Sequence, residues 1–194
     1  MIFMGVGGDW YPHAPKIDAL LSNRLAIRGF LGTREAGKCL FGSASKDQAL
    51  QYTRDGSDDD LRVLRPERDA VISWVPNMTD MILEFERHLG NLRYGSGCFY
   101  NGVKFATLAK DIAGDIGIAE TYLRLNRQRR ALAAMADSFL DQYELEERRL
   151  GDDDDVTALL DGHIGEVWIT GPCRVVKYEP GIELHSNSRV LGQV

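Results

Sequence analysis

The sequence predicts an α+β domain, and two observations lead to that prediction. Short apolar segments bounded by glycine or proline, which are typical of strands, occur mainly toward the two ends of the chain. Between them, an apolar stripe at helical spacing runs from Ile118 to Tyr143. Segments in the order strands, helices, strands favour α+β over a regular alternation of the two. We expect the last two strands to return to the sheet that the first strand begins.

The strand predictions depend on where apolar runs stop. The first run closes at Gly7-Gly8, and the last two flank a Gly171-Pro172 turn. By the same pattern, strands are predicted at Ile2–Val6, Lys38–Gly42, Leu61–Leu64, Ala70–Val75, Glu166–Thr170 and Cys173–Tyr178. We expect one split or bent sheet to hold all of them apart from Leu61–Leu64, with the long helix packed outside it.

Two helices are predicted in the first part of the chain. Pro15 is a favourable first helical residue, and apolar positions continue at helical spacing to Leu25. Ser45 and Gln48, three residues apart, match a capping box. That signal predicts a helix from Ser45 through Tyr52.

Two further helices are predicted in the middle of the chain. Thr79 is the expected cap of a helix that reaches Leu89. Charged residues beyond Tyr143, as far as Arg148, continue the solvated face of the long helix, and Gly151 ends it. Residues 1–179 are therefore expected to form one domain with a mainly helical insertion at about 78–160, and 180–194 a loosely ordered tail.

Composition is that of an ordinary globular protein. Hydrophobic residues make up 44% of the 194 residues and charged residues 27%, and the formal net charge is −6. A negative balance disfavours a protein that coats nucleic acid. No apolar run approaches the roughly 20 residues of a membrane helix. The first residues lack a basic leader region, and the three cysteines form no CxxC pair. We therefore expect a cytoplasmic protein without a membrane span or a disulfide framework.

Several common catalytic signatures are absent from the sequence. It contains no phosphate-binding GxxxxGK[ST], no HExxH, no GxSxG and no GxGxxG that opens a helix. The four histidines stand alone, so a transition-metal site is not expected. The run Asp152–Asp155 lacks the spaced ligands of a calcium loop and is interpreted as a solvated helix start.

Three segments together resemble the ADP-ribosyltransferase superfamily. Phe41-Gly-Ser-Ala-Ser45 is similar to that family's Phe-x-Ser-Thr-Ser strand, and the Ala-Leu-x-Tyr helix that follows is also usual there. The segment from Glu166 to Ile169, followed by Gly171-Pro172, resembles the strand that bears the family's catalytic acid. The likeness covers roughly the first 55 residues and residues 160–178, and it extends to a small anti-CRISPR ADP-ribosyltransferase.

The resemblance implies a split mixed sheet with a helical insertion, and a site for NAD. It makes Glu166 the catalytic acid, with Asp161 in reserve. Arg28 or Arg34 would offer a guanidinium to the pyrophosphate. The NAD-binding residues it implies are Met4, Gly5, Arg28, Phe41, Ser43 and Ser45. We expect Gly5, Arg28, Phe41, Ser43 and Glu166 to converge on one cleft.

Each of these residues also has a purely structural interpretation. Ser43 and Ser45 are then strand and cap residues, Glu166 a solvated residue at a strand start, and Arg28 a surface turn residue. Met4 stands where the family usually has histidine or arginine, and Ile164 where its toxins have glutamate or glutamine.

The resemblance implies an NAD-dependent mono-ADP-ribosyltransferase. Its acceptor would be a macromolecule, a protein before a nucleic acid, and its role that of a toxin or a phage counter-defence protein. The alternative, favoured by Met4, is a non-enzymatic binding or inhibitor protein that keeps the fold without turnover. RNA 2′-phosphotransfer on a related fold would require a paired basic and histidine site that the sequence does not show.

Overall fold

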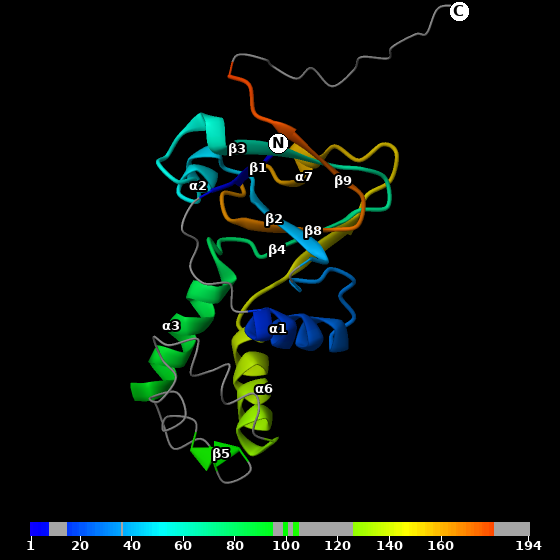
Figure 1. Ribbon diagram of the computed structural model, residues 1–194. Coiled ribbons are helices and arrows are strands. Elements are labelled where there is room, and N and C mark those ends of the chain that lie inside the picture. The colour runs from blue at the N-terminus through cyan, green and yellow to red at the C-terminus, as the bar shows by residue number, and fades with distance from the viewer. Residues whose placement is uncertain (8–14, 36, 95–98, 101–102, 105–125, 181–194) are drawn as a thin grey trace, which may run out of the picture.

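The computed structural model describes residues 1–7, 15–35, 37–94, 99–100, 103–104 and 126–180. A strongly twisted sheet occupies one end of the molecule, and three longer helices occupy the other (Figure 1). The N-terminus lies in the sheet layer. No helix among the described residues has the length and apolar character needed to cross a membrane.

The main sheet has seven strands in the order β7-β4-β8-β2-β1-β3-β9. Their bounds are β1 Ile2–Gly5, β2 Cys39–Ser43, β3 Leu61–Pro66, β4 Val71–Trp74, β7 Glu146–Arg149, β8 Glu166–Thr170 and β9 Cys173–Lys177. The expectation that the first and last strands share one sheet is confirmed. A separate two-stranded ladder joins β5, Phe99–Tyr100, to β6, Val103–Lys104.

The expectation of a mixed sheet was wrong, because every pairing in the main sheet is antiparallel. The paired strands β3 and β9 carry exposed charged residues, Arg65, Arg174 and Lys177, as antiparallel strands that contact solvent can. The structure therefore confirms α+β as the fold class.

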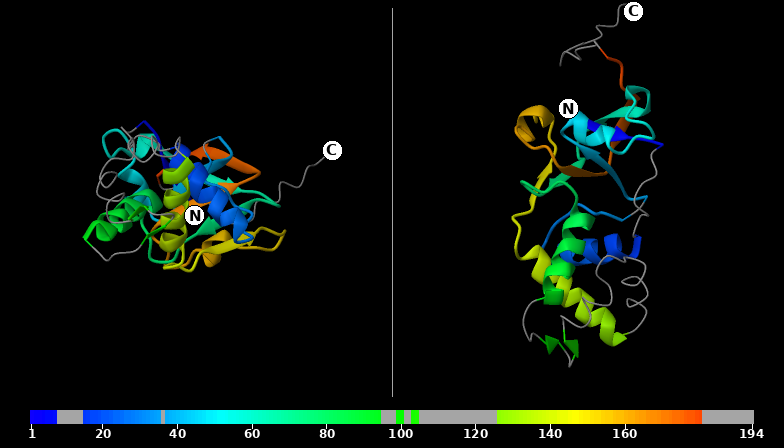
Figure 2. Two further views of the ribbon diagram at one scale, coloured as in Figure 1. Left: turned by 90° about the horizontal axis from the view of Figure 1, so that it is seen from below. Right: turned by 90° about the vertical axis from the view of Figure 1, so that its left-hand side faces the viewer.

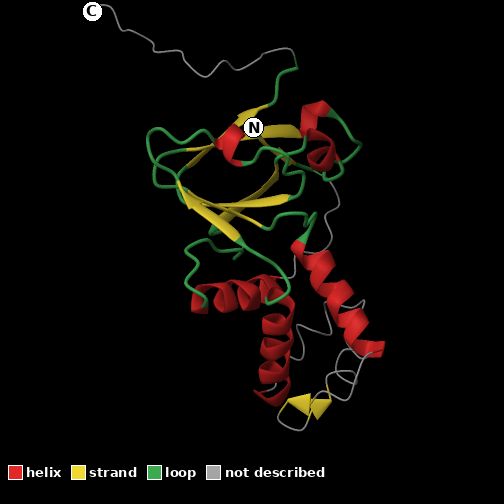
Figure 3. Cartoon of the chain, turned by 180° about the vertical axis from the view of Figure 1, so that it is seen from behind, coloured by secondary structure: helices red, strands yellow, loops and turns green. Residues whose placement is uncertain are grey.

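The helices are α1 Pro15–Ile27, α2 Lys46–Leu50, α3 Met81–Tyr94, α6 Asn126–Leu140 and α7 Val156–Leu159, with a 3₁₀ turn η1 at Asp58–Asp60. Helices α1, α3 and α6 gather on one side of the sheet, whereas α7 lies on the opposite side (Figures 2 and 3). Ser45 caps α2 as predicted, since its side chain accepts a hydrogen bond from the Gln48 amide.

The sheet separates two apolar cores because successive side chains of a strand point to opposite faces. In β8, Val167 and Ile169 join the core that faces α7. Trp168 points the other way and packs with α1, α3 and α6, among them Leu21, Phe85 and Phe139. Glu166 shares the face of Trp168, so it lies on the side of the long helices.

The long central helix ends earlier than predicted. Within the described residues α6 ends at Leu140, and the predicted part from Ile118 to Leu125 lies outside them. Glu146–Arg149 forms strand β7 instead and pairs with β4. Its four charged residues give no apolar pattern, and Glu147 orders this segment by accepting hydrogen bonds from the amides of Leu31 and Gly32.

The cap of α3 also differs from the prediction. Asp80, rather than Thr79, caps α3, because its Oδ1 accepts a hydrogen bond from the Leu83 amide at 2.9 Å. The tail at 181–194 lies outside the described residues.

Gly5 allows α2 to pack directly on β1. A Cβ at this position would lie 2.5 Å from the Ala49 carbonyl oxygen and 2.9 Å from that of Tyr52. Because both atoms are backbone, we expect Gly5→Ala to destabilise the protein by about 1–3 kcal/mol in urea unfolding. Gly90→Ala is the control, since nothing lies within 4 Å of its Cβ; it should stabilise by up to about 1 kcal/mol. Equal stabilities for the two variants would contradict this packing.

Candidate functional site

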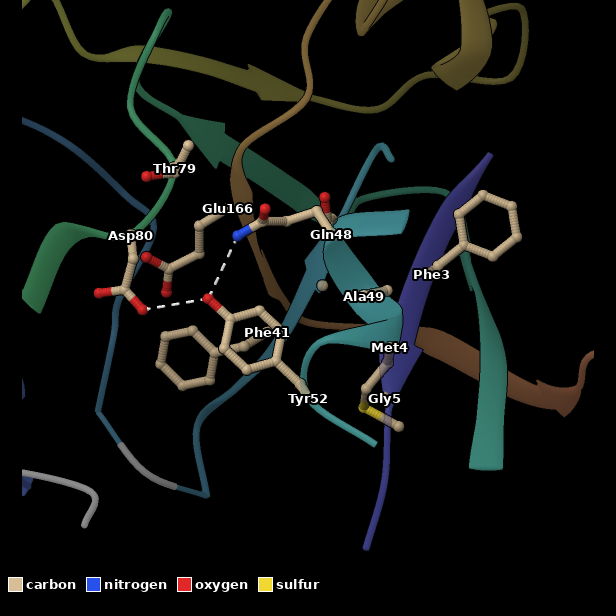
Figure 4. A pocket seen from close by; sticks show the side chains of 12 residues that line it. Phe3, Met4, Gly5, Phe41, Gln48, Ala49, Tyr52, Thr79, Asp80 and Glu166 are labelled. Carbon is tan, nitrogen blue, oxygen red and sulfur yellow. Dashed lines mark hydrogen bonds between the residues drawn. The ribbon is translucent and has the colours of Figure 1, made fainter. Parts of the chain in front are cut away.

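The candidate site is a hollow between β1, β2, α2 and the start of α3 (Figure 4). Four NAD-binding residues implied by the resemblance, and its catalytic acid, line it: Met4, Gly5, Phe41, Ser43 and Glu166. Gln48, Tyr52, Thr79 and Asp80 complete the wall, with Phe3, Gly42 and Ala49. The cavity volume is about 20 Å³, which accommodates about one water molecule.

Strand register brings the central residues together. Ser43 pairs with Glu166 across β2 and β8, and Phe41 pairs with Trp168. Side chains directly opposite each other in an antiparallel pair lie on the same face of the sheet. Two residues from β2 and two from β8 are therefore adjacent, although more than half of the chain separates them in sequence.

Glu166 has a partner at each carboxylate oxygen. Oε1 accepts a hydrogen bond from Arg34 Nη1 at 2.9 Å, and Oε2 accepts one from the Met81 amide at 2.9 Å. Met81 is the first residue of α3, so the carboxylate also meets the positive end of that helix. Burial raises the pKa of the Glu166 carboxyl, although the Arg34 guanidinium acts in the opposite direction. The interpretation of Glu166 as a solvated residue does not fit this geometry.

Arg34 is the buried cation that holds Glu166. Its side chain is only 2% exposed. Its Nε donates to Asp18 Oδ1 at 3.0 Å, while Nη1 donates to Glu166. The guanidinium carbon lies 5.0 Å from the ring centroid of Phe41 and 4.6 Å from that of Trp168. Because two carboxylates and two rings surround Arg34, its guanidinium does not face the hollow as a pyrophosphate ligand would.

Three polar side chains that we did not predict form the opposite wall. Tyr52 Oη lies 3.3 Å from Asp80 Oδ2 and 3.4 Å from Gln48 Nε2. Figure 4 shows all three directed toward Glu166. Burial and the nearby Asp80 raise the pKa of the Tyr52 hydroxyl, so it is protonated at neutral pH. The Ala-Leu-x-Tyr pattern predicted Tyr52 within the helix, whereas α2 ends at Leu50 and Tyr52 lies in the turn that follows. No local signal related it to Asp80.

The two serines have structural roles. Ser43 Oγ donates to the Ile164 carbonyl oxygen at 2.9 Å and accepts from the Ser45 amide at 3.1 Å. Ser45, predicted to bind NAD, is not part of the lining of the hollow, and its Oγ is occupied as the cap of α2. These bonds fix the end of β2 against the segment that leads into β8, and thereby position Glu166.

Two predicted residues lie elsewhere. Arg28 does not line the hollow, and the expected convergence is wrong for this residue: its guanidinium donates to Asp137 on α6 and to Asp141 just beyond that helix. Asp161 lies in a separate groove beside His163. Both are placed by tertiary contacts, which sequence spacing does not reveal.

Asp137 joins α1 to α6 through two arginines. It accepts hydrogen bonds from Arg24 at 2.6 and 2.8 Å and from Arg28 at 2.6 Å. Burial acts to raise the pKa of Asp137, but these hydrogen bonds outweigh it and leave the pKa below its ordinary value. A depressed folded-state pKa stabilises the fold at pH values above the unfolded pKa of about 3.9. That stabilisation is lost as pH falls below about 3.9 and through the lower folded-state pKa.

We therefore expect Asp137→Asn to cost about 1–3 kcal/mol at neutral pH and less at about pH 3. Urea unfolding at several pH values measures this. The neighbouring exposed Asp141, which accepts only from Arg28 in this cluster, gives the control Asp141→Asn with a smaller loss. If the loss of stability caused by Asp137→Asn did not change with pH, the lowered pKa of Asp137 would not be what stabilises the fold.

Among the residues that the structure describes, no group of three or more histidine, cysteine, aspartate or glutamate side chains is placed to hold a metal ion. The thiol of Cys39 is free, and burial raises its pKa to about 12. Comparison of the chain with protein-family models, with curated proteins and with solved structures gave no match.

Proposed function

We propose that this protein is an NAD-dependent mono-ADP-ribosyltransferase with Glu166 as its catalytic acid. One observation carries the proposal. Met4, Gly5, Phe41, Ser43 and Glu166, which the family resemblance assigns to an NAD site, come from three separate segments and line one hollow. The acceptor is a macromolecule, and a role as a toxin or phage counter-defence protein rests on the resemblance alone.

The side chains that line the hollow fit the chemistry of NAD cleavage. Loss of nicotinamide leaves positive charge on the ribose, and a fixed carboxylate stabilises such charge. Glu166 is held by Arg34 and the start of α3, so its position does not need to reorganise during the reaction. Phe41 and Tyr52 supply aromatic surface for a flat ring.

The volume of the hollow does not fit NAD as it stands. Small-molecule sites usually measure roughly 300–1,000 Å³, against the 20 Å³ found here. NAD binding therefore requires the wall of Gln48, Tyr52 and Asp80 to move. The three side chains are linked to one another by hydrogen bonds of 3.3 Å (Tyr52 to Asp80) and 3.4 Å (Gln48 to Tyr52), which are long and weak.

The small volume and the two partners of the Glu166 carboxylate favour a second candidate. In that case the chain is a binding or inhibitor protein without turnover, and the buried ion pair of Arg34 and Glu166 only stabilises the fold. The two candidates differ in whether NAD binds at all.

The deciding experiment combines a melting curve with an assay of nicotinamide release. For the transferase, NAD at a hundred times its dissociation constant stabilises the protein by about 2.7 kcal/mol. Nicotinamide is then released when cell lysate supplies an acceptor. Absence of both effects would overturn the transferase and favour the second candidate, and binding without release would show an NAD-binding protein that lacks turnover.

A further inference from the structure

A second and larger hollow adjoins the candidate site. Its volume is about 490 Å³, within the usual range of ligand sites. We call it the acidic groove. The residues that matter for its chemistry are Trp74, Leu159, Glu146, Asp161, His163 and Ile164.

The acidic groove and the candidate site share a wall. Thr79 lines both hollows. The segment before β8 separates them: the Ile164 carbonyl oxygen accepts a hydrogen bond from Ser43 on the side of the site. The Ile164 side chain, 61% exposed, lines the groove. His163 Nε2, also in the groove, lies 3.2 Å from the Glu166 carbonyl oxygen. A molecule in the groove would therefore lie next to the segment that carries Glu166.

The groove has a negative charge that nothing in the described structure neutralises. Glu146 and Asp161 are exposed, and neither forms an ion pair among the described residues. No lysine or arginine belongs to the described lining. Arg148, two residues along β7 from Glu146, is bound to Asp154 at 2.7 Å. His163 adds little positive charge at neutral pH, because burial lowers its pKa.

We propose that the acidic groove binds a lysine- or arginine-bearing segment of a partner protein. Long basic side chains combine a cationic head with an aliphatic stem. The carboxylates of Glu146 and Asp161 attract the head, and the apolar surface of Leu159 and Ile164 packs against the stem. The same carboxylates repel the phosphates of nucleic acid. This binding goes beyond NAD cleavage and does not require it.

The test is fluorescence anisotropy of a short labelled peptide of alternating lysine and glycine, titrated with the full chain without NAD. Exposed charge pairs contribute up to about 1 kcal/mol each, so the double variant Glu146→Gln/Asp161→Asn should bind about tenfold more weakly. The matched control is Glu144→Gln/Asp55→Asn, which removes two exposed carboxylates outside the groove lining. It should bind like the wild type, and melting curves check that both variants fold.

Three outcomes would overturn the inference. The first is equal weakening in both double variants, which would show attraction to overall charge. The second is equal binding of the same peptide with its lysines acetylated. The third is tighter binding of a labelled oligothymidylate than of the lysine peptide. The peptide titration contains no NAD, so a negative result in it would not count against the proposed transferase. In the same way, a negative NAD assay would not count against peptide binding in the acidic groove.

Discussion

Replacing Glu166 with glutamine is expected to slow nicotinamide release from NAD by about a hundred- to a thousandfold. The amide has the size of the carboxylate and keeps one acceptor for Arg34 or for the Met81 amide. It lacks the negative charge, which matters most when positive charge develops on the ribose. NAD affinity should change much less, because an amide still binds a hydroxyl in the ground state. Initial rates and NAD-dependent melting shifts measure the two effects separately.

A glutamine substitution at Glu147 is a matched control that shows how much of the effect comes from lost stability alone. It lies on the same face of the sheet as Glu166 and accepts hydrogen bonds from the Leu31 and Gly32 amides and from Ser73. It does not line the hollow. Glu147→Gln should therefore lower the melting temperature without slowing the reaction of the folded protein. Full activity of Glu166→Gln would refute its catalytic role, and a loss confined to Asp161→Asn would transfer that role to the reserve acid.

Replacing Arg34 with methionine is expected to destabilise the protein by about 3–5 kcal/mol, the largest loss of stability we predict. Methionine keeps most of the volume between Phe41 and Trp168 but removes the guanidinium that contacts both Asp18 and Glu166. Arg28→Met is the control: this arginine is also ion-paired, but its side chain is 25% exposed. Because water screens an exposed pair, that loss should be about 1 kcal/mol. Urea unfolding at neutral pH compares the two.

The loss of unfolding free energy caused by Arg34→Met should become smaller as pH falls from about 7 toward 5. The guanidinium lowers the pKa of the Glu166 carboxyl, so without it burial raises that pKa further above its unfolded value of about 4. A carboxyl with a raised folded-state pKa binds protons more tightly when folded, so stability increases as pH decreases. Adding Asp18→Asn and Glu166→Gln to Arg34→Met should recover part of the loss for the same reason. If Arg34→Met lost less unfolding free energy than Arg28→Met, the central role of this ion pair would be refuted.

Local sequence patterns were sufficient for most elements of the fold. Apolar runs closed by glycine or proline located β1, β2, β4, β8 and β9 to within one or two residues. The Ser45 and Gln48 pair located the start of α2, because a cap is formed by neighbours in sequence. The charged strand β7 was missed because its order comes from pairing with β4 and from the bonds of Glu147, neither of which leaves an apolar pattern.

By itself, the sequence determined the α+β class, most strands and part of the residues that line the hollow. Only the tertiary structure decided which side chains act together. The register of β2 and β8 placed Ser43 beside Glu166, and the loop between α1 and β2 brought Arg34 to that carboxylate. Arg28 carried the same charge in the sequence, yet it pairs with Asp137. Contacts between distant segments depend on strand register and helix packing, which short-range patterns do not encode.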